Sequence, residues 1–171
     1  MVLEIFNAKL KPLSNEDVQA IVDIEFHPKV KVWLYGFSIS TFQKELRDYQ
    51  EFFKKLPKNK KGDMFIARFN GKIVGFLGLW RLGVHMQHVA SIGVSVHPDY
   101  WGQGIATQLI KSAIDFARLK GFRRLEIETL SENLSMRHIT EQLGFNLEST
   151  RKERVHKDGI YHDEAVYYML L

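Results

Sequence analysis

The sequence predicts a mixed α/β fold of three layers, in which a central sheet lies between helices. Segments whose apolar residues alternate with polar ones outnumber segments with apolar residues at helical spacing, and the two kinds are interleaved along the chain. No internal repeat, linker or low-complexity stretch interrupts the 171 residues, so a single domain over 1–171 is expected. The expected elements add up to a mixed sheet of about seven strands flanked by four helices.

The first part of the chain predicts one strand and two helices. The strand covers 4–10. Ser14 then begins a helix, because a serine followed three residues later by Asp17 can form a capping box. The His-Pro pair at 27–28 ends or bends this helix, since proline disfavours helical geometry in the preceding residue. A second helix is expected to begin near Ser40.

The middle of the chain carries the clearest local signal. Strands over 64–69 and 72–80 flank Asn70-Gly71, the pair that a type I′ turn favours because both residues tolerate positive φ. This pattern predicts a hairpin. The remaining elements are a strand over about 88–96, a helix over 104–120, a strand over 124–130, a helix over 133–143, and strands over 148–156 and 165–171.

Composition argues against several classes of protein. Without cysteine the chain holds no disulfide framework and no cysteine nucleophile. No window approaches the roughly 18 apolar residues that cross a bilayer, and no signal-peptide core is present. A cytoplasmic protein without membrane contact is therefore expected.

The net charge of +4 raises the question of nucleic-acid binding. Much of the excess lies in a lysine run between 54 and 61. Such a run is typical of a solvated loop, whereas a nucleic-acid surface spreads basic residues over a face and interleaves aromatic ones. We therefore expect no nucleic-acid partner, although a basic nucleic-acid-binding domain stays open as an alternative.

Residues 101–107, Trp-Gly-Gln-Gly-Ile-Ala-Thr, separate a strand from the long helix. Glycines let the backbone pass close to a ligand, and a helix N-terminus presents unpaired N–H groups and a positive dipole end. The combination predicts a phosphate or pyrophosphate site. It is neither a P-loop, which needs Gly-Lys-Ser/Thr, nor a dinucleotide fingerprint, because Thr107 stands where the third glycine belongs.

This loop and a second block resemble the motifs of the GNAT superfamily of N-acetyltransferases. In the family loop, Arg/Gln-x-x-Gly-x-Gly/Ala, Gly104 and Ala106 match, and Trp101 occupies the Arg/Gln position. Tyr-Trp-Gly-x-Gly is similar to the RimJ/RimL-like ribosomal-protein branch. The second signature, Asn-x-x-Ala-x-x-Leu-Tyr-x-x-x-Gly-Phe, is matched in spacing by Asn133, Ile139, Gly144 and Phe145, with Met136 in place of alanine.

The resemblance implies how acetyl-CoA (coenzyme A carrying an acetyl group) is held. The strands that end at Val96 and start at Arg124 would splay apart to admit it. Backbone groups of Val94, Ser95 and Val96 would pair with the pantetheine arm, and Asn133 would bond it near the thioester. The loop amides that would hold the pyrophosphate belong to Gly102, Gln103, Gly104, Ile105, Ala106 and Thr107.

The implied reaction transfers the acetyl group to a primary amine of a protein N-terminus, amino acid, polyamine or antibiotic. Many family members protonate the leaving thiolate with a tyrosine seven residues after the asparagine, and this chain has Thr140 there. Ser135, His138, Tyr161 or an ordered water could substitute. The missing tyrosine keeps a second function open, a catalytically weak module that binds acetyl-CoA.

The base that accepts the amine proton has two candidates. The family's usual glutamate position on the earlier strand is Ser91, so Glu128 on the later strand is the favoured base. The alternative for Glu128 is a strand carboxylate paired with Arg124 or Arg68. His88 is the second candidate base, with a core histidine as its alternative.

The stretch after the first helix is where the family builds its acceptor wall. Rings and carboxylates there suit a cationic amine, although core packing and a solvated helix face explain them equally. The residues are Trp33, Tyr35 and Phe37, with Asp23, Glu25, Glu45 and Asp48. His85 with His88, or His156 with His162, lack the carboxylate pattern of a zinc site, so no metal is expected. The C-terminal strands could also form a homodimer seam.

Overall fold

The structure, a computed structural model, describes residues 2–35 and 41–171. One seven-stranded mixed sheet runs in the order β1-β2-β3-β4-β5-β7-β6. The strands are β1 (Leu3–Asn7), β2 (Gly62–Phe69), β3 (Lys72–Arg81), β4 (Val89–Val96), β5 (Arg124–Leu130), β6 (Asn146–Lys157) and β7 (Ile160–Leu170). The α-helices are α1 (Asn15–Phe26), α2 (Pro28–Lys31), α3 (Phe42–Lys55), α4 (Ile105–Leu119) and α5 (Leu134–Gln142).

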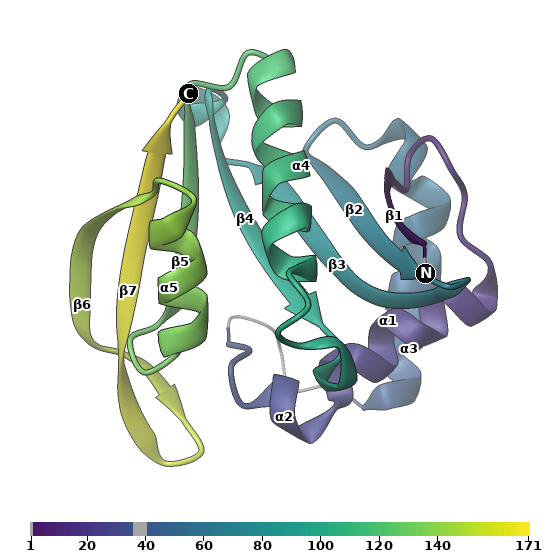
Figure 1. The fold of residues 1–171 in the computed structure, drawn as a ribbon, viewed down its shortest axis with the longest axis horizontal. Coiled ribbons are helices and arrows are strands. Elements are labelled where there is room, and N and C mark those ends of the chain that lie inside the picture. The colour runs from purple at the N-terminus through teal and green to yellow at the C-terminus, as the bar shows by residue number, and fades with distance from the viewer. Residues whose placement is uncertain (1, 36–40) are drawn as a thin grey trace.

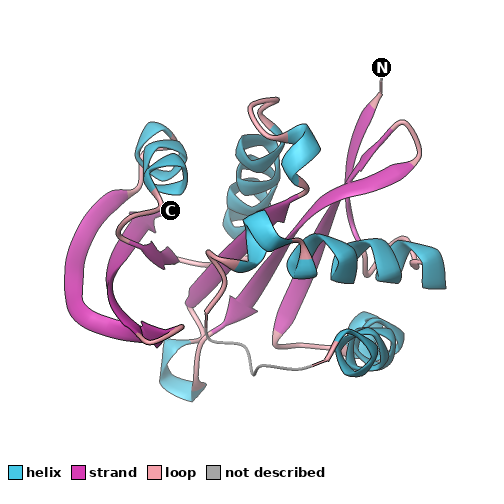
Figure 2. Cartoon of the chain, turned by 90° about the horizontal axis from the view of Figure 1, so that it is seen from below, coloured by secondary structure: helices cyan, strands magenta, loops and turns pink. Residues whose placement is uncertain are grey.

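Helices lie on both faces of the sheet, as Figures 1 and 2 show. Helix α4 packs on β2, β3 and β4, and α5 packs on β5, while α1 and α3 pack together on the opposite face. The larger apolar core lies between α4 and the sheet, around Leu109, Ile110 and Leu125. The predicted three-layer fold with a seven-stranded mixed sheet is confirmed.

The described residues contain five α-helices where the sequence predicted four. The additional helix is α2, which starts at Pro28 directly after α1 ends. Proline suits the first turn of a helix, and the His27 side chain caps this turn by accepting a hydrogen bond from the Lys29 N–H. The His-Pro pair therefore ends one helix and begins the next.

Local signals in the sequence were accurate. Ser14 Oγ accepts a bond from the Asp17 N–H, and the Asp17 side chain accepts one from the Ser14 N–H, which completes the predicted capping box. Asn70 and Gly71 have φ of 47° and 84°, as the predicted hairpin requires. Ser40 lies outside the described residues, and α3 is capped by Thr41.

The two C-terminal strands are longer than predicted. They extend over 146–157 and 160–170 and meet at a tight turn with positive φ at Asp158 and Gly159. Strand β6 is exposed along almost its whole length, so no buried face imposes an apolar alternation on its sequence. The pattern of apolar and polar residues therefore could not show where β6 begins and ends.

Strands β4 and β5 pair over only part of their length. Parallel pairing joins Val89 to Arg124, Ala90 to Leu125 and Ser91 to Glu126, and the register stops there. Beyond this point the two strands diverge, as Figure 1 shows. The predicted splay is confirmed. Residues 92–96 of β4 and 127–130 of β5 do not pair with each other through backbone hydrogen bonds.

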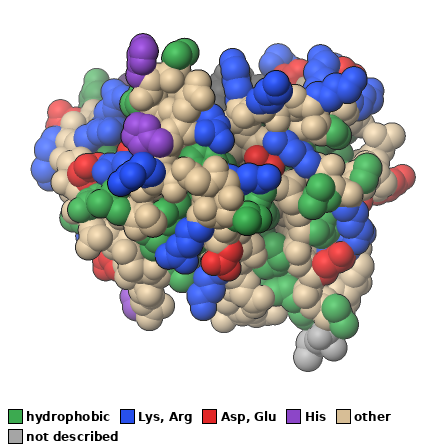
Figure 3. Space-filling model, turned by 90° about the horizontal axis from the view of Figure 1, so that it is seen from above, with side chains coloured by type: hydrophobic (Ala, Val, Ile, Leu, Met, Phe, Trp, Pro, Cys, Tyr) green, Lys and Arg blue, Asp and Glu red, His purple; other side chains and the backbone are tan. Residues whose placement is uncertain are grey.

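The surface carries charges of both signs. On the face drawn in Figure 3, lysines and arginines alternate with acidic and apolar side chains. The lysine run is exposed at Lys54, Lys55, Lys58, Lys60 and Lys61, as expected for a solvated loop. In the described part of the chain, no helix is long and apolar enough to span a membrane.

Candidate active site

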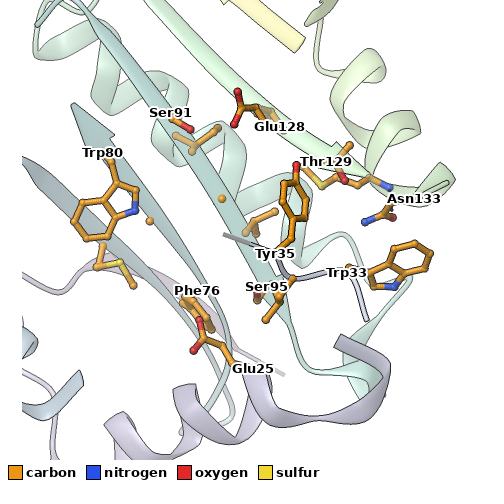
Figure 4. A pocket seen from close by; sticks show the side chains of 18 of the residues that line it. Glu25, Trp33, Tyr35, Phe76, Trp80, Ser91, Ser95, Glu128, Thr129 and Asn133 are labelled. Atoms are coloured by element: carbon orange, nitrogen blue, oxygen red, sulfur yellow. Dashed lines mark hydrogen bonds between the residues drawn. The ribbon is translucent and has the colours of Figure 1, made fainter. Parts of the chain in front are cut away.

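A cavity of about 500 Å³ lies where β4 and β5 diverge. Figure 4 shows its side chains converging from both strands, from α1 and from the segment after α2. Strand β4 contributes Ser91–Ser95 and β5 contributes Ile127–Thr129. The other lining residues are Glu25, Trp33, Leu34, Tyr35, Glu45, Asp48, Tyr49, Phe52, Met64, Phe76, Gly78, Trp80, Asn133 and Met136.

The β4 edge of the cavity offers free backbone. Val94 and Ser95 line it, in line with their predicted place beside an extended ligand arm. Val96 is buried next to them, and its carbonyl oxygen accepts a 2.7 Å hydrogen bond from the Trp101 indole N–H. Trp101 therefore joins the glycine loop to the end of β4, and the Val96 carbonyl, which was predicted to pair with the pantetheine arm, is bonded to Trp101 instead.

The glycine loop leaves the start of α4 open. Gly102 and Gly104 have φ of 74° and 73°, a region that favours glycine. Gly104 is the N-cap of α4 and has no side chain to bond the first N–H groups of the helix. The first amides of α4, at Ile105, Ala106 and Thr107, therefore have no side-chain cap. A helix start of this kind suits the predicted binding of a diphosphate.

Asn133 lies across the cavity from β4. It caps α5, with its Oδ1 accepting a bond from the Met136 N–H. The Asn133 amide group therefore stands at the cavity wall in a fixed orientation. Its predicted contact with the pantetheine arm fits this position.

The position of the missing tyrosine carries no free acid. Thr140 is fully buried, and its hydroxyl donates to the Met136 carbonyl oxygen at 2.8 Å inside α5. Ser135 and His138 are exposed on α5, and the Tyr161 ring stacks on His156. None of these side chains lines the cavity.

The predicted base Glu128 lines the cavity and is bound to an arginine. Its carboxylate lies 2.9 Å from Arg151 Nη1, and the same nitrogen lies 2.8 Å from Glu164, whose side chain is almost fully buried. The alternative of an ion-paired strand carboxylate is therefore confirmed for Glu128, but with Arg151 as the partner. Arg124 and Arg68 were the wrong partners, because they bind other carboxylates. Arg151 comes from β6 and reaches Glu128 across β7, a contact that depends on strand pairing.

His88 lies apart from these groups. It precedes β4 at the end where β4 and β5 are still joined, and its carbonyl oxygen accepts from the N–H groups of Arg123 and Arg124. The residue is exposed and does not line the cavity. The structure therefore does not bring His88 to the site, and a core position for it was wrong.

The acceptor wall predicted after the first helix forms part of the cavity. Trp33 and Tyr35 line it, together with the carboxylates of Glu25, Glu45 and Asp48. Asp23 is exposed on α1 and does not line it, and Phe37 lies outside the described residues.

Glu25 is the most buried of the lining carboxylates. Only 8% of the residue is exposed, and its Oε1 accepts a 2.7 Å hydrogen bond from the Tyr49 hydroxyl. Burial raises the pKa of Glu25 to about 7, with a smaller rise from the charge of Glu45 and a partial reduction by the Tyr49 bond. The sequence placed Glu25 near the wall and did not single it out.

Two aromatic features shape the rest of the cavity. The Tyr35 hydroxyl is buried and has no hydrogen-bond partner among the described residues, and burial raises its pKa. In Figure 4 Tyr35 lies between Glu128 and Glu25. The Trp80 ring lies over Gly62 and Gly78, where an added Cβ would come within 2.1 Å and 2.7 Å of it. Glycines at 62 and 78 leave room on the sheet for the Trp80 ring. They were the signal in the sequence for the place of Trp80, and this signal was missed.

Comparisons with known proteins agree with this geometry. The Acetyltransferase (GNAT) family profile matches residues 21–145. An uncharacterised N-acetyltransferase from Methanocaldococcus jannaschii is 36% identical over 98 residues, which are 55% of this chain and 43% of that relative, so the chain spans less than half of its length. Spermidine N(1)-acetyltransferase from Escherichia coli K12 is 25% identical over 92% of this chain and 82% of the relative.

A solved structure shows the same fold. The structure of yncA from Salmonella typhimurium, determined with its cofactor acetyl-CoA, superposes with a TM-score of 0.80 at 20% identity, over 100% of this chain and 95% of that one. Because the family profile covers most of the chain and the splayed strands and glycine loop lie within the match, the chain belongs to the Acetyltransferase (GNAT) family, whose cofactor is acetyl-CoA.

Proposed function

We propose that the protein is an N-acetyltransferase whose acceptor is a cationic primary amine without a neighbouring carboxylate. The observation that carries the proposal is the charge of the cavity. Its described lining contains the four carboxylates Glu25, Glu45, Asp48 and Glu128 and no lysine or arginine. Glu128 and Asp48 are paired with Arg151 and Lys44, which lie outside the lining, and Glu25 has no such cation among the described residues. This local charge is opposite to the net charge of +4 of the whole chain.

The acidic lining discriminates between classes of acceptor. An ammonium group near several carboxylates is stabilised by their charge, and the low dielectric of the aromatic wall strengthens the attraction. An amino acid also carries a carboxylate, which needs a cationic partner when it leaves water. The described lining provides none, so amino acids are the disfavoured class. The similarity to a spermidine N(1)-acetyltransferase also supports an amine acceptor that carries no carboxylate.

The chain's own residues hold and orient both reactants. The amides at the start of α4 bind the diphosphate, the free edge of β4 at Val94 and Ser95 pairs with the pantetheine arm, and Asn133 contacts that arm from the other side. Bound acetyl-CoA supplies the activated acetyl thioester. Trp33, Tyr35 and Trp80 surround the acceptor end and exclude water, which keeps the amine rather than water as the nucleophile.

Matched acceptor pairs test the proposal. Cadaverine and lysine differ only by the carboxylate of lysine, and agmatine and arginine form a second such pair. Release of free thiol from acetyl-CoA is expected with at least about tenfold higher kcat/KM for the carboxylate-free member of each pair, a difference of about 1.4 kcal/mol in transition-state stabilisation. Equal rates would refute the charge argument. Binding of acetyl-CoA without thiol release from any amine would favour the weakly catalytic module instead.

A further inference from the structure

We propose that Glu25, rather than Glu128, accepts the proton that the acceptor ammonium loses before it attacks the thioester. This inference rests on the proposed function and assigns a residue to its proton-transfer step. A primary ammonium has no free electron pair, so a group in the cavity must remove one proton before the nitrogen becomes nucleophilic.

The placement of Glu25 carries the proposal. It comes from the C-terminal half of α1 and lines the same cavity as the free β4 edge at Val94 and Ser95. Figure 4 shows its carboxyl group directed toward the cavity beside Phe76 and near Ser95. A single hydrogen bond from Tyr49 holds one oxygen, and no cation is paired with the carboxylate in the described residues. The second oxygen can therefore receive a proton.

Glu128 is differently placed for this step. Its carboxylate forms an ion pair with Arg151, and protonation would break that pair while Arg151 stayed charged beside Glu164. The side chain is also 38% exposed, so water competes for its oxygens. Glu128 contributes negative charge to the cavity, but proton uptake there costs an ionic contact that Glu25 does not have.

The groups around Glu25 favour a proton acceptor that works near neutral pH. From α3, Tyr49 donates a hydrogen bond and Glu45 adds negative charge. Strands β3 and β4 present only uncharged side chains to the cavity, the lysines of α2 are exposed, and the His27 ring packs against His97. Burial dominates, and it raises the pKa of Glu25 to about 7. A base with a pKa near the working pH is half ionised and can still hold the proton it takes.

The protons and bonds of the proposed reaction balance. One ammonium proton moves to the Glu25 carboxylate, and the neutral nitrogen then forms a C–N bond to the thioester carbonyl carbon. As the C–S bond breaks, the second proton leaves nitrogen and neutralises the thiolate sulfur. The product is a secondary amide and free thiol, and the proton on Glu25 returns to water.

The pH dependence of kcat/KM with cadaverine tests the assignment. For the wild type, kcat/KM is expected to be constant above about pH 7 and to fall below it as Glu25 becomes protonated. Glu25→Gln is expected to lower kcat/KM at least about 100-fold near neutral pH. It should also replace the plateau by a continuous rise with pH, because only amine already neutral in solution then reacts. Glu128→Gln should keep the wild-type shape, and Asp23→Asn, an exposed carboxylate on the same helix, should keep both shape and rate.

A second measurement does not depend on turnover. Calorimetric titration of cadaverine into the coenzyme A complex, in buffers of different ionisation heat near pH 7, counts the protons displaced on binding. The wild type is expected to release about half a proton from Glu25, and Glu25→Gln none. An unchanged proton count in Glu25→Gln, or a plateau lost in Glu128→Gln and kept in Glu25→Gln, overturns the assignment. Absence of turnover with every amine overturns the proposed function, and the proton count still tests Glu25.

Discussion

The ammonium group of Lys157 lies 2.8 Å from the carbonyl oxygen of Leu34. It also donates to the carbonyl oxygens of Lys31 and Val32, at 2.6 Å and 2.9 Å. Three carbonyls at the C-terminal end of α2 and just beyond it form a favourable site for a cation. Through this one side chain, the end of β6 is joined to the segment that carries Trp33 and Tyr35, more than a hundred residues earlier in the chain.

Replacing Lys157 is expected to loosen the acceptor wall. Lys157→Met keeps the aliphatic stem and removes the three charge-assisted hydrogen bonds, so the segment with Trp33 and Tyr35 loses its anchor. KM for the amine should rise about fivefold to tenfold, and the affinity for coenzyme A should stay within about twofold. Lys60→Met, at an exposed position, is the control. An unchanged KM in Lys157→Met would show that the wall holds its place without the lysine.

Gly104→Val is expected to impair cofactor binding. A branched residue at φ near 73° carries a strain of at least about 1–2 kcal/mol, and the loop would shift the N-terminal amides of α4 to relieve it. Calorimetry should show at least about tenfold weaker binding of coenzyme A. Gly121→Val is a matched control, since Gly121 has the same φ at the other end of the same helix and should lose stability without losing affinity. Equal affinities in both variants would contradict the role of the loop.

Glu25 is expected to make stability depend on pH. Its pKa is raised on folding, from 4.5 to about 7, so the folded state holds the proton more tightly than the unfolded state does. Stability from this group is therefore fully present at pH values below about 4.5 and is lost as pH rises through about 7. Glu25→Gln resembles the protonated form and should gain on the order of 3 kcal/mol over the wild type at pH 8.5 or above.

Thermal unfolding at two pH values checks this expectation. The gain in melting temperature of Glu25→Gln should be large near pH 8.5 and mostly absent near pH 5, with about 1 kcal/mol remaining there. A gain of the same size at both values would mean that the carboxyl group is not held by burial in the way the structure indicates.

Gly62→Ala is expected to move Trp80. The added Cβ would lie 2.1 Å and 2.3 Å from two carbons of the indole ring, so the ring must leave its place on the sheet. Because Trp80 lines the cavity and Gly62 does not, KM for the amine should rise severalfold while coenzyme A binding is kept. Gly83→Ala, which has 3.8 Å of clearance, is the control. Tryptophan fluorescence that stays unchanged in Gly62→Ala would contradict this contact.

The sequence was sufficient wherever the cause of a structure is local. The capping box at Ser14 and the turn at Asn70-Gly71 depend on residues a few positions apart, and both were confirmed. The family motifs placed the glycine loop and the splay of β4 and β5, because backbone geometry at those points is tied to specific residues. Helix α2 was missed because a His-Pro pair marks the end of one helix and does not reveal whether another begins.

The candidate site depends on contacts that the sequence does not contain. Arg151 reaches Glu128 only through the register of β6 on β7, and β6 has no apolar alternation from which to read that register. Glu25 lies on the same face of α1 as Val18 and Ile21, and Asp23 lies off that face, so helical spacing separates the two carboxylates. The hydrogen bond from Tyr49 of α3 to Glu25 depends on tertiary packing, which the sequence does not reveal. Burial and pairing, rather than residue type, separate the proposed functional carboxylates from the solvated ones.

The acidic lining of the cavity in this basic protein also bears on which end of the cofactor enters the cavity. Coenzyme A carries its negative charges on the nucleotide and an uncharged acyl group at the far tip. In the proposed binding mode, carboxylates in the cavity repel the phosphates and tolerate the neutral tip, which favours entry of the thioester first, with the nucleotide at the rim beside α4. The same carboxylates attract a positively charged acceptor. The acceptor and the thioester can therefore occupy different parts of the cavity with their reacting atoms in contact.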